Sequence, residues 1–273
     1  MIIDGKQIKE KYLNQIKEEI TGKKITLAVI QIGADEASTV YVGQKEKMCN
    51  QIGANFNHYT FDENASEEEI INLINKLNEN DTTGILVQLP LPSKFNKDKI
   101  INTIKPEKDV DGLTDKNLIN LVKGEDTIIP CTALGVMKIL EEINTDIEGK
   151  HAVIIGRSNL VGKPLYNLLL NKNATVTLCH SHTKNLKEIS LSADILVCAT
   201  NQKHIITSDM VKKGSILIDV GIIRENSKLY GNADYENIKD ITSYITPVPG
   251  GVGPLTIAML ANNLLKAYEM QRR

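Results

Sequence analysis

The sequence predicts an α/β protein with two domains. Helical and strand patterns alternate along nearly all of the 273 residues, and such alternation is typical of parallel sheets whose strands are joined by helices. Several expected strands are short, continuous apolar runs, as in strands buried on both faces. The length corresponds to about two domains of roughly 150 residues. We therefore expect two parallel sheets, each covered by helices.

In the first half, periodicity and capping signals define the elements. Apolar residues recur at helical spacing over residues 6–20, and a second helix over 36–52 ends at a glycine. Ser66 and Glu69 form a capping box before a third helix. Short strands are expected at residues 25–31, 54–60 and 84–88.

The second half repeats this alternation. Strands are expected at residues 151–155, 175–178, 194–199, 215–220 and 243–246. Helices are expected over 161–171 and 255–271, the second with apolar positions at helical spacing. No repeat or low-complexity linker separates the halves, so we place the boundary near residues 128–135.

Composition excludes several classes of protein. The 32 basic and 34 acidic residues leave a net charge of -2, which argues against a nucleic-acid or membrane-surface partner. Hydrophobic residues make up 41% and aromatic residues 4%, so we expect an aliphatic core. No run approaches the ~18 apolar residues of a membrane span. The N-terminal residues lack the apolar stretch of a secretory signal.

The cysteines indicate a reduced, cytoplasmic protein. Their spacing matches neither a zinc site nor a disulfide framework, and unpaired thiols are typical of the cytosol. We expect no bound metal. The four positions are Cys49, Cys131, Cys179 and Cys198.

Residues 153–164 (VIIGRSNLVGKP) could bind a dinucleotide phosphate. A strand runs into Gly156 and a helix follows, which presents backbone N–H groups and a helix N-terminus to a phosphate. Arg157 and Ser158 add a cation and a hydroxyl. The motif lacks the complete GxGxxG pattern, so an ordinary strand–helix loop is the alternative.

The segment after the next strand favours NADP over NAD. A protein that selects NAD usually places Asp or Glu here to bind the ribose hydroxyls, but residues 175–187 contain no acid. Arg157 and Ser181 could instead face a 2′-phosphate. Alternatively, Ser181 and His182 only solvate a loop.

Tyr41 and Lys45 have the spacing of one helix face. Such pairs also occur in short-chain dehydrogenases, but there the nucleotide-binding turn precedes the pair, whereas here Gly156 follows it by more than a hundred residues. A solvated surface helix is the alternative. Gln88 ends a buried strand before two prolines, at the strand end where α/β sheets bind ligands.

Two further segments suit a flat ligand. Asp109 and Asp111 lie in a turn, and a carboxylate can accept two parallel hydrogen bonds from an amino-pyrimidinone edge. The alternative is a common Asp-Gly turn. Residues 246–256 (TPVPGGVGPLT) form a rigid glycine- and proline-rich loop, which lets a backbone approach a ligand closely.

Taken together, these motifs resemble the methylenetetrahydrofolate dehydrogenase/methenyltetrahydrofolate cyclohydrolase family. The similarity covers nearly the whole chain, and PGGVGP followed by an apolar residue and Thr is especially specific. The matching segments occur in the family's order: residues 41–45, Gln88 with LPLP, 108–112, 130–132, 156–164 and 249–256.

The resemblance implies a bifunctional enzyme that oxidises 5,10-methylenetetrahydrofolate with NADP and hydrolyses the product to 10-formyltetrahydrofolate. It makes Lys45 the catalytic lysine, tuned by Gln88, while Tyr41 and Asp111 position the folate. The other implied contacts are Gly156, Arg157, Ser158, Ser181 and Ile222 with the dinucleotide, and Pro249, Gly250 and Gly251 with the substrate.

The resemblance also implies an N-terminal catalytic domain, residues 1–129, onto which the last helix (about 255–273) packs. Residues 130–254 become a Rossmann-like NADP-binding domain. Tetrahydrofolate derivatives, with or without polyglutamate, are the expected substrates, in one-carbon metabolism and purine biosynthesis. A cytoplasmic homodimer is expected.

Alternatives remain because the chain departs from the family pattern. A monofunctional or NAD-preferring member is one, and a non-catalytic nucleotide-binding subunit is another, although Lys45, Gln88 and Asp111 together argue against the latter. Lysine could act as a base only if its pKa, normally about 10.4, were lowered. The departures are at residues 113–115 (LTD), Ala133, His182 and 198–204 (CATNQKH).

Overall fold

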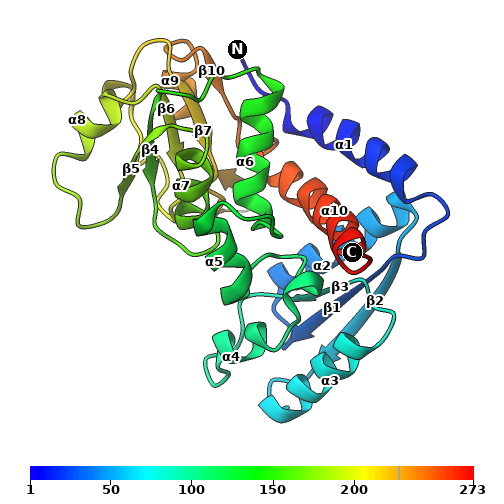
Figure 1. Cartoon of the computed structure of the whole chain (residues 1–273). Helices are drawn as coiled ribbons and strands as arrows, with labels where there is room; N and C mark the ends of the chain where they lie inside the picture. The colour runs from blue at the N-terminus through cyan, green and yellow to red at the C-terminus, as the bar shows by residue number, and fades with distance from the viewer. Residues whose placement is uncertain (227) are drawn as a thin grey trace. The chain divides into compact units, whose positions relative to one another are not determined.

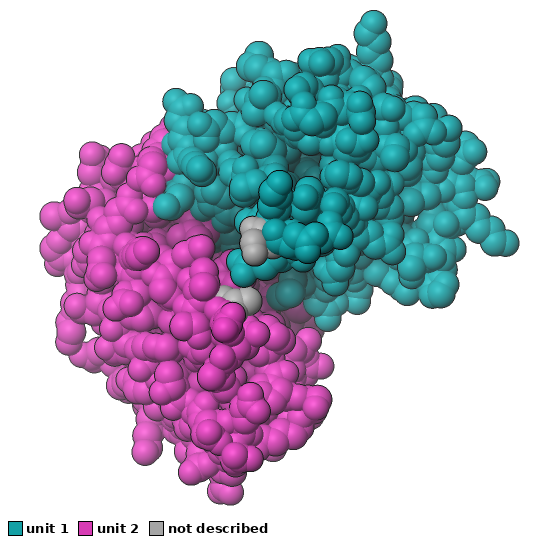
Figure 2. Space-filling view, turned by 180° about the vertical axis from the view of Figure 1, so that it is seen from behind, with its two compact units in different colours: residues 1–9, 132–256 teal, residues 10–131, 257–273 magenta. Residues whose placement is uncertain are grey.

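The computed structural model describes residues 1–226 and 228–273, which form two compact units (Figures 1 and 2). Unit 1 contains Met1–Lys9 and Thr132–Thr256, and unit 2 contains Glu10–Cys131 and Ile257–Arg273. Residues 1–9 were expected in the same domain as residues 10–129. They belong to unit 1 because Ile3 N donates to Ile245 O and Gly5 N to Gly250 O, both at 2.9 Å. Such long-range pairing leaves no local sequence signal.

Unit 2 is built on a three-stranded parallel sheet in the order β2-β1-β3. The central strand is buried along its whole length, which explains its unbroken apolar sequence. The strands are β1 (Thr26–Ile32), β2 (Asn55–Phe61) and β3 (Gly84–Val87). The helices are α1 (Gly5–Ile20, entering from unit 1), α2 (Glu36–Ile52), α3 (Glu67–Glu79), α4 (Lys97–Asn102) and α5 (Asp115–Lys123).

Local side chains set the helix boundaries in unit 2. Asp35 caps α2 by accepting from Ser38 N at 2.7 Å, and Gly53 ends that helix with φ of 86°. The expected capping box of Ser66 and Glu69 is present at the start of α3. α3 and α4 pack on one face of the sheet through an aliphatic cluster.

The last helix, α10 (Val252–Met270), packs on unit 2 with its second part, as expected. Met259 and Leu264 are fully buried there. Lys266 Nζ donates to Thr127 O at 2.6 Å, and Gln271 Nε2 donates to Thr83 O at 2.8 Å. These bonds tie the C-terminal helix to loops of the N-terminal half.

Unit 1 contains a five-stranded parallel sheet in the order β10-β7-β6-β4-β5. Numbered along the unit, this is the doubly wound order 2-1-3-4-5, which has its topological switch between β4 and β6. The strands are β4 (His151–Ile155), β5 (Thr175–Cys179), β6 (Ile195–Cys198), β7 (Ile216–Asp219) and β10 (Tyr244–Ile245). The antiparallel hairpin is formed by β8 (Ile223–Glu225) and β9 (Lys228–Tyr230).

Helices cover both faces of this sheet. One aliphatic cluster packs α6 and α7 on the face of Ala152 and Ile154, and another packs α8 and α9 on the face of Val153 and Ile155. The helices are α6 (Cys131–Glu142), α7 (Gly162–Leu170), α8 (Leu186–Leu191) and α9 (Tyr235–Ile238). Among the described residues, no helix combines the length and apolar character needed to cross a membrane.

Candidate active site

The predicted lysine and glutamine meet in unit 2. Helix α2 carries Tyr41 and Lys45 one turn apart; Tyr41 is 41% exposed, whereas Lys45 is half-buried. Lys45 Nζ donates a hydrogen bond to Gln88 Oε1. Gln88 is buried just after β3, and its Nε2 donates to Leu89 O at 2.6 Å. The Gln88 amide is therefore held so that its oxygen faces the lysine.

The surroundings of Lys45 lower the pKa of its ammonium group. Burial lowers the pKa of the Lys45 ammonium, and the nearby Asp111 and Cys131 only partly oppose this shift. Burial also raises the pKa of the Asp111 carboxyl, while Lys45 acts in the opposite direction. The shift is in the direction that a lysine needs in order to act as a base, which the sequence could not show.

The two predicted aspartates have different surroundings. Asp109 is 1% exposed, and its carboxylate accepts from Gly112 N at 3.0 Å, Thr114 N at 2.7 Å and Asn117 Nδ2 at 3.0 Å. It therefore holds the turn together. Asp111 is partly exposed and lies within electrostatic reach of Lys45, so it is the aspartate available to a ligand.

Gly156 lies at the topological switch of the unit 1 sheet. It follows β4 with φ of 123°, and a Cβ there would lie 2.3 Å from the carbonyl oxygen of Ala199, which follows β6. A Cβ on Gly162, at the start of α7, would lie 1.9 Å from Gly156 O. Both positions therefore require glycine. A close strand–turn–helix approach at the switch is where doubly wound folds bind nucleotides.

The other predicted nucleotide contacts lie in this turn or in segments that follow β5 and β7. Arg157 is exposed. Burial lowers the pKa of His180, which directly follows β5, and the positive charge of Arg157 lowers it further. Ser181 is also exposed. Ser158 is exposed as well, and its Oγ accepts from Val161 N at 3.1 Å, which stabilises the turn. Ile222 is 50% exposed shortly after β7.

Asp219 and Asn232 organise the loops at this edge, and sequence reasoning missed both. Asp219, at the end of β7, accepts from Gly221 N and Asn232 N at 2.9 Å and from Ala233 N at 2.7 Å. Asn232 accepts from Thr200 N at 3.1 Å and donates to Thr200 O at 3.0 Å. Asp219 lies near the end of an expected strand and Asn232 lies outside every expected element, so local patterns carried no packing information for either residue.

The predicted substrate loop belongs to unit 1. Gly250 has φ of 110° and accepts from Gly5 N, while a Cβ on Gly251 would lie 2.7 Å from Pro247 O. Pro249 follows a cis peptide bond. The loop is therefore compact and requires glycine. Tyr41, Lys45, Gln88 and Asp111 belong to unit 2.

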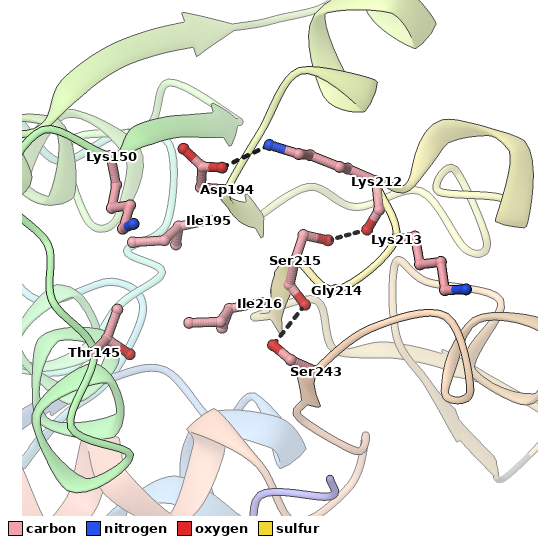
Figure 3. A pocket seen from close by; sticks show the side chains of 10 residues that line it. All are labelled: Thr145, Lys150, Asp194, Ile195, Lys212, Lys213, Gly214, Ser215, Ile216 and Ser243. Atoms are coloured by element: carbon pink, nitrogen blue, oxygen red, sulfur yellow. Dashed lines mark hydrogen bonds and ion pairs between the residues drawn. The ribbon is translucent and has the colours of Figure 1, made fainter.

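A cavity of about 200 Å³ opens at the opposite edge of the unit 1 sheet, where its strands begin (Figure 3). Lys212 and Asp194 form an ion pair at 2.7 Å on its wall, and Lys150 and Lys213 also line it. It contains none of the predicted site residues. Within the described part of the chain, no three His, Cys, Asp or Glu residues are grouped as metal ligands.

These features define a two-unit α/β protein with a glycine turn at the switch point of one sheet and a cluster of Lys45, Gln88 and Asp111 in the other unit. A model of the tetrahydrofolate dehydrogenase/cyclohydrolase catalytic domain matches residues 3–111, and the corresponding NAD(P)-binding domain model matches residues 130–272. The chain therefore belongs to the tetrahydrofolate dehydrogenase/cyclohydrolase family.

Individual relatives agree along nearly the full length. The bifunctional protein FolD of Lachnoclostridium phytofermentans is 51% identical, with 96% of each chain covered. The crystal structure of bifunctional FolD from Campylobacter jejuni is 44% identical, with a TM-score of 0.97 and 99% of each chain covered. The Trypanosoma brucei enzyme, complexed with NADP and an inhibitor, is 33% identical with a TM-score of 0.95, and the match covers 100% of this chain and 98% of that one.

Proposed function

We propose that this chain oxidises 5,10-methylenetetrahydrofolate to the 5,10-methenyl cation with NADP and hydrolyses that cation to 10-formyltetrahydrofolate. The observation that carries the proposal is the half-buried Lys45, bonded to Gln88 beside Asp111, with its pKa lowered by burial. Relatives named as bifunctional dehydrogenase/cyclohydrolases support the same reading.

Oxidation requires alignment of the reactants more than proton transfer. The hydride leaves a carbon between two nitrogens, which share the resulting positive charge, so the protein has to hold the reactants close and oriented. In this proposal Asp111 binds the amino-pyrimidinone edge of the pterin and Tyr41 supports the folate. The Pro249–Gly251 backbone is assigned to the same substrate.

The residues of unit 1 fit NADP. When bound, NADP supplies the nicotinamide that accepts the hydride. Gly156 and Gly162 let the strand, the turn and the start of α7 pack closely, and the diphosphate is assigned to the N-terminus of α7 that this turn presents. Arg157 and Ser181 are assigned to the 2′-phosphate. Ile222, exposed after β7, is assigned to the nucleotide surface.

Hydrolysis requires proton transfer, which Lys45 is placed to perform. Water adds to the methenyl carbon and loses one proton to neutral Lys45 Nζ. The carbon–N5 bond of the resulting carbinolamine then breaks as N5 gains a proton and the hydroxyl loses one, which leaves the formyl group on N10. Gln88 Oε1 holds Nζ in place throughout.

Several finer assignments belong to the same proposal. Residues 1–129 with about 255–273 would bind folate, and residues 130–254 would bind NADP. The protein would act as a cytoplasmic homodimer that supplies one-carbon units for purine biosynthesis and also accepts polyglutamylated folates. Light scattering of the purified chain tests the dimer, because a monomeric mass at working concentration would contradict it.

One assay tests the central proposal. Purified protein is mixed with 5,10-methylenetetrahydrofolate and NADP, and formation of NADPH and of the methenyl cation is followed by absorbance. Parallel reactions contain NAD, and others start from the methenyl cation to isolate hydrolysis. Activity in both steps supports the bifunctional enzyme. Activity in one step only would indicate a monofunctional member, and failure of both would contradict the proposal.

A further inference from the structure

Asn263 is a buried polar residue on an apolar face of α10. It is 1% exposed and lies one helical turn from Met259 and from Ala267, which are both fully buried. Asparagine is a weaker helix former than either neighbour, and a buried amide is costly unless it is hydrogen-bonded. The hydrogen bonds of its side chain must therefore explain why an asparagine occupies this position.

The Asn263 amide joins two backbone segments of unit 2. Its Nδ2 donates to the carbonyl oxygen of Val110 at 3.0 Å and to that of Ile129 at 2.8 Å. These bonds use both hydrogens of the amide group. Its Oδ1 has no hydrogen-bond partner among the described residues. A flipped amide would place that oxygen against two carbonyl oxygens, so the donors must face the backbone.

Both carbonyls lie beside residues of the candidate site. Val110 directly precedes Asp111, and Ile129 lies two residues before Cys131. Cys131 Sγ lies 3.4 Å from Asn263 Nδ2 and donates to Val110 O at 3.5 Å. Cys131 and Asp111 also lie within electrostatic reach of each other, because each acts on the pKa of the other. Asn263 therefore contacts the peptide group that joins Val110 to Asp111 and the thiol of Cys131, which is an electrostatic neighbour of the Asp111 carboxyl.

We propose that Asn263 is a positioning residue that orients Asp111 for folate binding. The inference rests on the proposed function, in which Asp111 holds the pterin. Two parallel hydrogen bonds require the carboxylate to be held at a fixed angle. Gly112, which follows Asp111, has φ of 69°, and the Asp109 carboxylate holds the turn on that side. The Asn263 amide adds a restraint on the other side of Asp111, at the carbonyl of Val110.

Two substitutions separate hydrogen bonding from packing. Asn263→Leu keeps a similar volume and removes both donors, whereas Asn263→Ser keeps one donor. We expect Asn263→Leu to raise the KM for folate about tenfold or more in both reactions, with the KM for NADP changed less than about twofold. The folate KM of Asn263→Ser should lie between the values for Asn263→Leu and the unsubstituted chain. If Asn263→Leu does not fold, the folate KM of Asn263→Ser tests the inference.

A matched control is available in the same unit. Asn78 is also buried, donates to Thr103 O at 2.8 Å and accepts from Lys105 N at 3.0 Å, but does not contact the site. Asn78→Leu should lower the melting temperature without changing the folate KM. If Asn263→Leu showed the same pattern as Asn78→Leu, Asn263 would be structural and the inference would be overturned.

A double-mutant cycle tests whether Asn263 acts through Asp111. In the Asp111→Ala background, Asn263→Leu should raise the folate KM little further, because the group that it orients is already gone. A full additional increase would overturn the inference and leave the proposed function intact. An unsubstituted chain that lacks both activities would instead overturn the proposed function and this inference with it.

Discussion

Lys45 Nζ is hydrogen-bonded to the side-chain oxygen of Gln88, 43 positions further along the chain. Helix α2 carries the lysine, and the loop after β3 carries the glutamine. The glutamine is neutral, so it holds the lysine without stabilising its charge as a carboxylate would. Burial can therefore lower the lysine pKa, and the first predictions concern this pair.

Lys45→Met should separate the two activities. Positioned proton transfer contributes typically 10²–10⁴-fold, so we expect cyclohydrolase activity to fall about that far while dehydrogenase activity falls less. Tyr41→Phe should be milder in hydrolysis, since Tyr41 is assigned to positioning. Both steps are assayed on each purified variant, with circular dichroism to confirm folding. Near-normal hydrolysis by Lys45→Met would assign the proton transfer to another group.

Gln88→Glu should move the pH profile of hydrolysis upward. Lys45 acts as a base only when neutral, so cyclohydrolase activity rises as pH increases through its pKa, which burial places below the usual lysine range. A carboxylate at position 88 favours the ammonium and raises that pKa. Rate profiles against pH test this, with Gln88→Ala as the uncharged control. If the rise of the cyclohydrolase rate with pH occurs at the same pH in Gln88→Glu as in the unsubstituted chain, Lys45 is not the titrating base.

Arg157→Ala should weaken NADP selectively. A hydrogen bond to a charged group is worth about 1.5–3 kcal/mol, or roughly ten- to a hundredfold in affinity. We expect the KM for NADP to rise by about that factor, whereas the KM for NAD should change little. Lys172→Ala, which removes an exposed cation just beyond α7, serves as the control. An equal loss with both cofactors would show that Arg157 has a structural role.

Asp111→Ala and Asp109→Ala should fail in different ways. Asp111→Ala should raise the folate KM in both reactions and leave stability nearly unchanged. Asp109→Ala leaves buried hydrogen-bond donors unpaired, and each unpaired donor destabilises the fold by about 1–3 kcal/mol. The free energy of unfolding measured in urea should therefore fall. Activity of the unsubstituted chain should survive exhaustive chelation. Unchanged folate affinity in Asp111→Ala, or loss of activity on chelation, would contradict the assignment.

Asn232→Ala should destabilise unit 1 and impair use of NADP. Its side chain is fully buried and bonds Thr200 through both donor and acceptor atoms, so each polar group left unpaired costs about 1–3 kcal/mol. Asn237→Ala, at an exposed site in α9, should change the free energy of unfolding by no more than about 0.5 kcal/mol. Denaturant unfolding and the KM for NADP are the measurements. Equal behaviour of the two variants would mean that Asn232 does not hold these loops.

Elements with strong local signals were predicted well from the sequence. The helix expected over residues 36–52 is α2 (Glu36–Ile52), and the strand expected over 151–155 is β4 (His151–Ile155). Helices α4, α5, α6, α8 and α9 were not predicted. Two of these, α4 and α8, have six residues each, and so short a segment shows little periodicity.

The sequence by itself determined the alternation of strands and helices, the fold class, the family and the residue types of the candidate site. Only the tertiary structure decided which of these residues meet. Strand order, the burial that lowers the pKa of Lys45, the separate roles of Asp109 and Asp111, and the bonds of Asn263 all depend on contacts between distant segments. Local patterns record the periodicity of each element, whereas long-range packing determines how much water and which charges surround a given side chain.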